Sequence, residues 1–242
     1  MHHRPEDATL TDLRIKQSGR DHGEYSEGAY FSHRLPHDPN RQRLWSVLCA
    51  FLGRYIHVDD TVLELGGGYC DFINNIRARE KHVVDVFDGI FRYAGQDVKA
   101  HVRSCTDLSE FRNESFQVVF ASNLFEHLTW PDLDQTVAEI RRVLSPGGKL
   151  ILVQPNFKYS YKEYFDDYTH RLIFTHTSLS DYLGTRGFRI SEIIARFLPY
   201  SMKSRYPKPS WLLRLYLASP IKPLAGQMLI VAERATAEGS LD

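Results

Sequence analysis

The sequence predicts an α/β fold, with a mostly parallel sheet and helices on both of its faces. Short apolar segments of strand length alternate along the chain with longer segments whose apolar residues recur at helical spacing. The first clear strand, residues 62–65, runs directly into three glycines at 66–68. A chain of 242 residues is long enough to bury the core of one large domain of this kind.

The remaining elements are predicted from the same two periodicities. Residues 1–37 are polar and have no sustained apolar period, so we predict a loosely structured N-terminal arm. Asp38 and Pro39 form an N-cap and first-turn pair for an amphipathic helix that leads into the first strand. Further helices are predicted at 70–79, 131–144 and 177–187, and further strands at 82–87, 100–103, 116–121, 149–153, 188–194 and 227–233.

The glycine segment indicates a ligand site. Glycines tolerate positive φ and let a ligand approach the backbone closely, and the amides of a following helix would face that ligand. A dinucleotide-binding turn needs a third glycine at position 71, where this chain has Asp71. Glu64, at the end of the strand, suits a cationic, amine-bearing ligand better than a pyrophosphate. A glycine turn with only a structural role is the alternative.

An acid follows the second strand as well. Asp85 stands where parallel nucleoside-binding sheets place a carboxylate that accepts hydrogen bonds from both ribose hydroxyls. Asp88, three residues on, competes for this role, and a solvated acid at a strand end is the structural alternative. We predict Asp85 as the ribose-binding residue.

Taken in order, these segments resemble class I S-adenosylmethionine-dependent methyltransferases over residues 38–235. The resemblance is carried by Glu64-x-Gly-x-Gly, by the acid after the second strand, by Glu126-His127 and by the Pro-Gly-Gly turn at 146–148. It implies a Rossmann-like sheet of seven strands with the last one antiparallel, and S-adenosylmethionine as cofactor. The cofactor residues that it implies are Glu64, Gly66, Gly67, Gly68, Asp85, Ser104, Cys105 and Asn123. The sequence departs from the family pattern at Cys70, Ser104 and Gln117.

The loop after the fifth strand, residues 154–171, offers acceptor chemistry. Its aromatic residues are interleaved with Asp166, Asp167 and His170, which could form a ring-binding wall with an acid/base group in it. A hydroxyl acceptor must lose a proton, and a histidine oriented by an aspartate is an efficient base for that step. We predict His170 as the base, with Asp167 or Asp166 orienting it. The alternative is that His170 and Arg171 form ion pairs with these acids that only hold the loop.

His127 is the second candidate base, unless it caps a helix or packs beneath the cofactor. Some ubiquinone-pathway O-methyltransferases with a similar Glu-His segment hold a divalent metal there. In this chain Asn123 stands where that site would have an acid, so we predict no metal.

An insertion, residues 197–226, separates the sixth and seventh predicted strands. It contains no acid and carries Lys203, Arg205, Lys208, Arg214 and Lys222, and residues 211–217 form an apolar helix candidate. We predict a lid over the acceptor first, a homodimer interface second and a peripheral membrane contact third. Residues 236–242 are a tail.

With residues 196–200, the insertion resembles bacterial methyltransferases of glycan and surface-polysaccharide biosynthesis. The resemblance implies O-methylation of a sugar hydroxyl on a saccharide, polysaccharide or glycolipid. The alternatives are a small aromatic or natural-product acceptor, and an inactive cofactor-binding partner subunit.

Composition excludes some classes of function. Thirty basic and thirty acidic residues cancel, which argues against a nucleic-acid partner. Three cysteines without metal-ligand spacing favour a reducing compartment. The N-terminus lacks an apolar signal region and no apolar segment is long enough to cross a membrane, so we predict a cytoplasmic protein.

Overall fold

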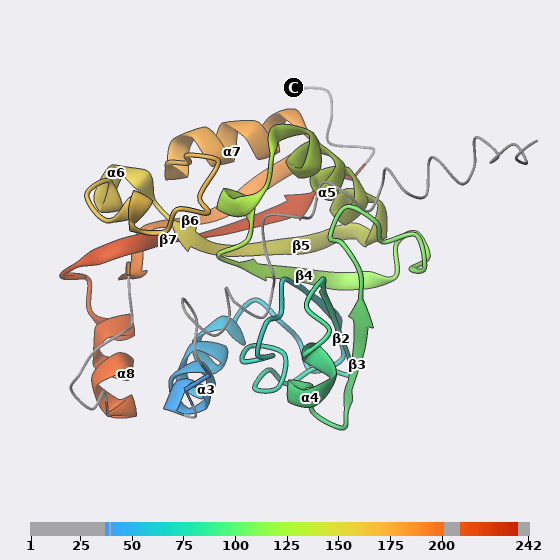
Figure 1. Ribbon diagram of the computed structural model, residues 1–242, viewed down its shortest axis with the longest axis horizontal. Coiled ribbons are helices and arrows are strands. Elements are labelled where there is room, and N and C mark those ends of the chain that lie inside the picture. Colours follow the sequence, from blue (N-terminus) through green and yellow to red (C-terminus); the bar gives the residue numbers. More distant parts are fainter. Residues whose placement is uncertain (1–36, 39, 201–208, 237–242) are drawn as a thin grey trace, which may run out of the picture. The chain divides into compact units, whose positions relative to one another are not determined.

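A computed structural model describes residues 37–38, 40–200 and 209–236 of the chain (Figure 1). The contacts divide the chain into two units, residues 1–39 and 40–242, and the fold below is that of the second unit. The predicted arm at 1–37 therefore lies almost wholly outside the described residues, as do Pro39, most of the tail and the insertion residues 201–208.

The second unit is built on one seven-stranded sheet in the order β3-β2-β1-β4-β5-β7-β6. Neighbouring strands from β3 to β5 are parallel, and β7 is antiparallel to both β5 and β6. This confirms the predicted fold. The strands are β1 (Thr61–Leu65), β2 (Glu80–Asp85), β3 (Val98–Val102), β4 (Phe116–Ser122), β5 (Leu144–Pro155), β6 (Phe188–Pro199) and β7 (Ala225–Arg234).

The described helices cover both faces of this sheet, with α5 and α7 on one side and α3, α4 and α8 on the other (Figure 1). They are α3 (Asn40–Leu52), α4 (Ile90–Tyr93), α5 (Trp130–Val143), α6 (Phe157–Ser160), α7 (His176–Thr185) and α8 (Ser210–Ala218), with single 3₁₀ turns η1 (Phe125–His127) and η2 (Tyr164–Asp166). The helix predicted at 131–144 begins and ends one residue earlier, as α5. Thr129 caps it by accepting a hydrogen bond from the amide of Asp132.

The strands are apolar on both faces because the core lies on both sides of the sheet. Leu63 and Leu65 of β1 join the cluster under α5 and α7, whereas Val62 joins the cluster under α3 and α8. In the second cluster the rings of Phe72 and Phe120 stack with their centroids 3.7 Å apart. The sheet is thus held rigid from both sides, which fixes the positions of the loops at its carboxyl edge.

The helix predicted at 70–79 is wrong. Residues 68–75 form turns instead, and Cys70 adopts a φ of 58°, outside the helical region. The side-chain amide of Asn75 donates to the carbonyl of Asp71 at 2.8 Å, while its backbone amide donates to Phe72 at 2.9 Å. The side chain therefore takes the carbonyl that a regular helix would bond through the backbone.

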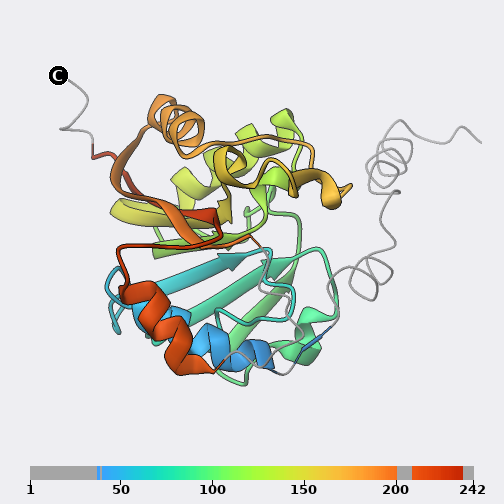
Figure 2. The ribbon, with the colours of Figure 1, turned by 90° about the vertical axis from the view of Figure 1, so that its left-hand side faces the viewer.

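The helix predicted inside the insertion is confirmed as α8. It lies beside α3 (Figure 2), where Leu213 and Leu217 are buried. Trp211, Leu212 and Leu215 of the same helix are exposed. In the part of the chain that the structure describes, none of the helices combines the length and the apolar character that a membrane crossing requires.

Candidate cofactor and acceptor site

The site begins at the turn after β1, where the backbone requires glycine. Gly66 and Gly68 have φ of 69° and 51°, in the left-handed region. Gly67 is required for space, because a Cβ on it would lie 2.1 Å from Cγ2 of Val83. β1 lies between β2 and β4, so the order in which the strands are added to the sheet reverses at β1. In open parallel sheets this reversal point is where ligands bind.

Asp85 links the end of β2 to this turn. Its Oδ2 accepts a hydrogen bond from the Gly68 amide at 2.7 Å, and its Oδ1 accepts one from the Phe87 amide at 2.9 Å. Each carboxylate oxygen keeps a second lone pair for a ligand hydroxyl. Burial raises the pKa of Asp85, and the two amide bonds oppose that shift. Asp88 is exposed, so the structure brings Asp85 and not its competitor to the turn.

Glu64 is almost fully buried, with 4% of its surface exposed. Its Oε2 accepts a hydrogen bond from the Ile73 amide at 3.1 Å, which holds the segment after the glycines. Burial raises the pKa of Glu64 well above its usual value, and the nearby carboxylates of Asp71 and Asp85 raise it further. Glu64 therefore stabilises the glycine turn by a hydrogen bond that lies inside the core.

Asp71 has a structural role that the sequence analysis missed. Its two oxygens accept from Arg41 Nε at 2.7 Å and from Gln42 Nε2 at 3.0 Å. Both donors lie in the first turn of α3, so this helix is tied directly to the glycine turn. Nothing in the spacing of these residues predicted the contact, which joins segments about thirty residues apart along the chain.

The loop after β3 carries Ser104 and Cys105. Ser104 Oγ lies 2.7 Å from Thr106 Oγ1 and accepts from the Thr106 amide at 3.2 Å, so the hydroxyl is already engaged. Cys105 Sγ accepts from Thr136 Oγ1 of α5 at 3.4 Å, and burial raises the pKa of its thiol. Both residues reach the same edge of the sheet as Asp85.

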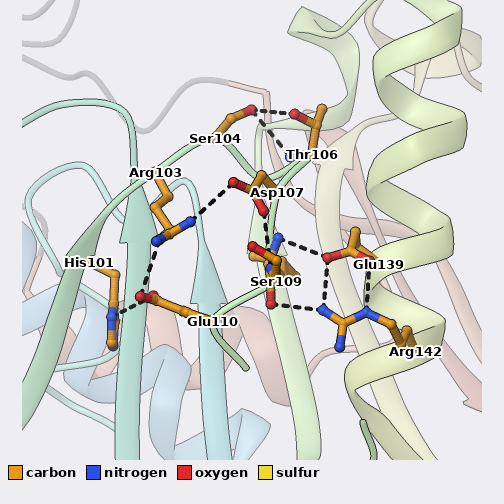
Figure 3. A network of polar contacts seen from close by, with 10 residues as sticks. His101, Arg103, Ser104, Thr106, Asp107, Ser109, Glu110, Glu139 and Arg142 are labelled. Atoms are coloured by element: carbon orange, nitrogen blue, oxygen red, sulfur yellow. Dashed lines mark hydrogen bonds and ion pairs between the residues drawn. The ribbon is translucent and has the colours of Figure 1, made fainter. Parts of the chain in front are cut away.

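A network of charged residues fixes this loop (Figure 3). Arg103 forms ion pairs with Asp107 at 3.0 Å and with Glu110 at 3.1 Å. Arg142 of α5 donates to the carbonyl of Leu108 at 2.7 Å, and Glu139 accepts from the Leu108 amide at 2.8 Å. The loop is therefore held in one conformation before any ligand arrives, which reduces the entropy lost on binding.

Asn123 follows β4 with a φ of 50°, and its amide donates to Val153 of β5 at 2.9 Å. Its side chain is exposed and its amide group contacts Ser122 Oγ at 3.3 Å. The next residue, Leu124, lies against the glycine turn: a Cβ on Gly66 would be 3.1 Å from Leu124 Cδ1. The carboxyl ends of β1 and β4 thus meet at one place.

Beyond the carboxyl ends of β4 and β5, the turn η1 and the loop after β5 bring three ionisable side chains together. We call Glu126, His127 and His170 the acceptor-side cluster. Their ligand atoms all lie within 4.8 Å of one another. His127 Nε2 is 4.0 Å from Glu126 Oε1, and the rings of His127 and His170 are 4.9 Å apart between centroids. The two backbones are joined as well, since the Arg171 amide donates to the Glu126 carbonyl at 2.7 Å.

The structure links Asp167 to His127 as well. Its Oδ1 accepts from Thr169 Oγ1 at 2.6 Å, and Thr169 Oγ1 is 2.8 Å from His127 Nδ1. These hydrogen bonds orient His127, a contact in addition to the predicted one, in which Asp167 or Asp166 orients His170. Asp166 is exposed on η2, and no contact brings it to the cluster. Thr169 was missed because its role depends on a contact with a residue forty-two positions away.

The cluster is strongly desolvated. Burial lowers the pKa of His127 to about 4, with the neighbouring His170 contributing in the same direction. Burial raises the pKa of Glu126 to about 8. Among the described residues, neither carboxylate oxygen of Glu126 has a hydrogen-bond partner, although only 1% of the residue is exposed. A buried polar group left in this state is costly, and such groups are uncommon in folded proteins.

The aromatic loop divides into two sets. Tyr164 is fully buried, donates its hydroxyl to the Leu172 carbonyl and packs against His170 with ring centroids 4.6 Å apart. A second set is exposed: Tyr159, Tyr161, Phe165 and Tyr168. The predicted ring-binding wall can therefore be formed only by the exposed set.

Tyr159 also lines an open groove of about 770 Å³ between the end of α3, strand β6 and the segment after α8. Three basic residues, Arg54, Arg196 and Lys222, line it, and none of its described lining residues is an acid. Arg196 lies over the Tyr159 ring at 5.2 Å. None of the predicted cofactor residues lines this groove.

The comparisons with known proteins agree with this arrangement. Residues 63–152 match a family model described as "Methyltransferase domain", which takes in the glycine turn, Asp85 and the Glu126-His127 pair. The polyketide synthase-nonribosomal peptide synthetase ACE1 of Pyricularia oryzae is 28% identical over 141 residues. That match covers 52% of this chain and 3% of the relative, so the chain corresponds to a small part of that protein.

Solved structures share the fold at low sequence identity. A complex of the Haloferax volcanii Trm112 methyltransferase activator with a methyltransferase matches with a TM-score of 0.62 at 18% identity, covering 81% of this chain and 92% of that one. A methyltransferase from Archaeoglobus fulgidus matches with 0.59 at 17% identity, covering 87% and 100%. Geranyl diphosphate methyltransferase in complex with S-adenosylmethionine matches with 0.58 at 16% identity, covering 83% and 92%. Residues 63–152 therefore match a methyltransferase domain, and the chain shares the fold of solved class I S-adenosylmethionine-dependent methyltransferases.

Proposed function

We propose that this protein transfers the methyl group of S-adenosylmethionine to a hydroxyl oxygen of a saccharide-containing acceptor. The observation that carries the proposal is the glycine turn bonded to Asp85 at the reversal point of the sheet. A nucleoside ligand placed there has a bare backbone beneath it and a carboxylate with free lone pairs for its ribose.

The cofactor residues have separate roles in this proposal. Asp85 binds the ribose hydroxyls, and Gly66 and Gly68 keep the turn open to the ligand. Ser104 and Cys105 border the base, in the loop that Arg142 and Glu139 hold. Glu64 positions the turn from below through the Ile73 amide.

The acceptor-side cluster provides the base that removes the proton from the hydroxyl group being methylated. The hydroxyl oxygen attacks the methyl carbon in line with the carbon–sulfur bond. The new oxygen–carbon bond forms as the carbon–sulfur bond breaks, and the sulfonium becomes the neutral thioether of S-adenosylhomocysteine. The hydroxyl proton leaves to the acceptor-side cluster, where the predicted base His170 lies 4.9 Å from His127 between ring centroids. Proton removal by a positioned side chain contributes roughly 10²–10⁴-fold to a rate.

Support for a saccharide acceptor comes from the exposed aromatic set and the basic groove. Aromatic faces pack against the apolar faces of sugar rings, and the arginines of a groove that has no acid among its described lining residues suit phosphate groups on a glycolipid. A natural-product acceptor is the second candidate. It is favoured by the similarity to a polyketide synthase-nonribosomal peptide synthetase and to geranyl diphosphate methyltransferase.

The test begins with calorimetric titration of S-adenosylmethionine and S-adenosylhomocysteine into the wild type and Gly68→Val. We expect binding by the wild type and none by the variant, because a β-branched residue is strained at a φ of 51°. Methyl transfer from labelled cofactor is then measured on saccharide, glycolipid and aromatic acceptors. Binding without transfer to any acceptor would indicate the inactive partner subunit, and transfer only to aromatic hydroxyls would replace the saccharide.

A further inference from the structure

We propose that Glu126, His127 and His170 bind a divalent first-row transition metal ion, such as Zn²⁺ or Mn²⁺, beside the methyl-acceptor site. This reverses the absence of a metal predicted from the sequence. A metal-bound imidazole has no lone pair left to accept a proton, so in the metal-bound protein this role replaces the base role given to His170 above. The proposal is tested by metal binding, which can be measured without an acceptor.

The first observation is the geometry of the cluster. One carboxylate and two imidazoles, from η1 and the loop after β5, place their ligand atoms within 4.8 Å of one another. Metal–ligand bonds of about 2.0–2.2 Å span at most about 4.4 Å between two ligand atoms, so small side-chain shifts would bring the three atoms around one ion. Among the described residues, this is the group of histidine, cysteine and acidic side chains that meets that condition.

The second observation is the state of Glu126. The residue is 1% exposed, and neither of its oxygens has a hydrogen-bond partner among the described residues. Buried carboxylates are normally paired, hydrogen-bonded or bound to a metal. The lack of a hydrogen-bond donor for Glu126 among the residues that the structure describes is explained if a cation binds its carboxylate.

The third observation is the orientation of His127. The single hydroxyl hydrogen of Thr169 goes to Asp167 Oδ1, at 2.6 Å. Thr169 Oγ1 must therefore accept from His127 Nδ1, which is 2.8 Å away, so the ring carries its proton on Nδ1. The lone pair of the neutral ring is then on Nε2, the nitrogen that faces Glu126. Metal-binding histidines characteristically donate their other ring N–H to a fixed acceptor in this way.

The ligand types decide the class of metal. Two imidazoles with one carboxylate suit Zn²⁺, Mn²⁺ or Fe²⁺, whereas Mg²⁺ and Ca²⁺ prefer oxygen ligands throughout. Asn123 is not among the ligands, because its exposed side chain contacts Ser122. Three protein ligands leave coordination positions open, and an oxygen bound there would lose its proton more readily.

The experiment measures metal binding by the full chain after treatment with a chelator. His2 and His3 are first replaced by alanine, because adjacent histidines near an N-terminus bind transition metals on their own. Zn²⁺ and Mn²⁺ are titrated by calorimetry, and Co²⁺ is added to record its visible absorption, which reports nitrogen and oxygen ligation. We expect one site per chain and a melting temperature that rises with metal concentration.

Substitutions then locate the site. Glu126→Gln keeps the shape of the side chain, and we expect it and His170→Ala each to weaken binding at least about 100-fold. Thr169→Val should weaken it about 10–100-fold, since it acts through the orientation of His127. The matched control is His101→Ala, which removes a histidine of a separate pair whose ring nitrogens already contact His82 and Glu110. It should bind metal as the parent does.

Two outcomes would overturn the proposal. One is the absence of a stoichiometric site in the parent chain, which would mean that only water occupies the cluster. The other is binding that persists in Glu126→Gln and His170→Ala. Affinity for S-adenosylhomocysteine is measured on the same proteins, so that a failed metal site is distinguished from a failed cofactor site or a misfolded variant.

Discussion

The glycine turn and the acceptor-side cluster lie at the same edge of the sheet but are built in different ways. The turn consists of residues close together in sequence, and its polar groups are paired: Asp85 accepts two amide hydrogen bonds and Glu64 accepts one. The cluster joins two distant loops and leaves Glu126 without a hydrogen-bond partner among the described residues. The first region is complete without a ligand, whereas the second requires one to satisfy its buried groups.

If the two regions act independently, substitutions in the cluster should affect turnover and spare cofactor binding. We expect His170→Ala and His127→Ala each to lower kcat by ~10²–10⁴-fold, because the hydroxyl proton has lost its acceptor. Affinity for S-adenosylhomocysteine should stay within a factor of a few. Steady-state kinetics and calorimetry on the same preparations check this. Lost cofactor binding with normal turnover at saturation would reverse the roles of the two regions.

The opposite result is expected for Asp85→Ala. Two hydrogen bonds from ribose hydroxyls to a carboxylate are lost, each contributing about 1.5–3 kcal/mol, so affinity for S-adenosylhomocysteine should fall by about 10²–10⁴-fold. Asp88→Ala is the matched control, because this acid is exposed and three residues away. Equal affinities in the two variants would remove Asp85 from the cofactor site.

The close packing of the turn can be tested by stability. Gly67→Ala places a Cβ 2.1 Å from Cγ2 of Val83, so β2 must shift. We expect the free energy of unfolding to fall by about 1–3 kcal/mol, the usual cost of overpacking. Gly184→Ala is the control, because a Cβ there meets nothing within 4 Å in α7. Denaturant unfolding of the two variants should differ clearly, and similar stabilities would contradict the packing argument.

Substitutions in helix α8 test whether the insertion contributes to the glycine turn or to the acceptor-side cluster. Leu213 and Leu217 face α3, and Trp211 and Leu215 face outward. We therefore expect the double variant Trp211→Ser, Leu215→Ser to change the KM for a water-soluble acceptor less than about twofold and to weaken binding to anionic vesicles about tenfold, through lost apolar burial. A strongly raised KM would support the lid that the sequence predicted, and a halved molecular mass would support the dimer interface.

The smallest effect is expected for Glu64→Gln, measured as melting temperature against pH. Because the native pKa of Glu64 is raised, its stabilising contribution is complete below the unfolded value of about 4.3 and is lost as pH rises toward the native pKa. Glutamine does not titrate and can still accept from the Ile73 amide. The variant should therefore melt a few degrees above the wild type at pH 7.5 and at the same temperature near pH 4. A gap that narrows as pH rises would contradict the assignment.

Local patterns predicted most of the fold and the cofactor side of the site. The seven-stranded sheet with its antiparallel last strand, α5 and α8 follow from periodicity and family resemblance, and the glycine turn and Asp85 lie where a short-range pattern places them. The helix at 70–79 could not be excluded in this way, since the positive φ of Cys70 is not visible in the apolar spacing.

The acceptor side was less accessible to sequence analysis because its contacts are between loops. The sequence named both histidines as candidate bases and Asp167 or Asp166 as the residue that orients His170, but it did not predict the link from Asp167 to His127. The hydrogen bonds to His127 pass through Thr169, and they form only when the ends of β4 and β5 lie side by side. The partnerless state of Glu126 is a property of packing, and no residue pattern encodes it.

The reversed direction of β7 has an evolutionary consequence. Because β7 runs against β5, the chain leaves β6 at Pro199 and re-enters the sheet at Ala225 on the edge where β5 ends, with Pro155 beside Gln227. Residues can be added or removed between these points without altering the register of any parallel strand. Selection can therefore remodel the surface near the acceptor while the catalytic scaffold stays unchanged, so substrate range and foldability can evolve as separate traits.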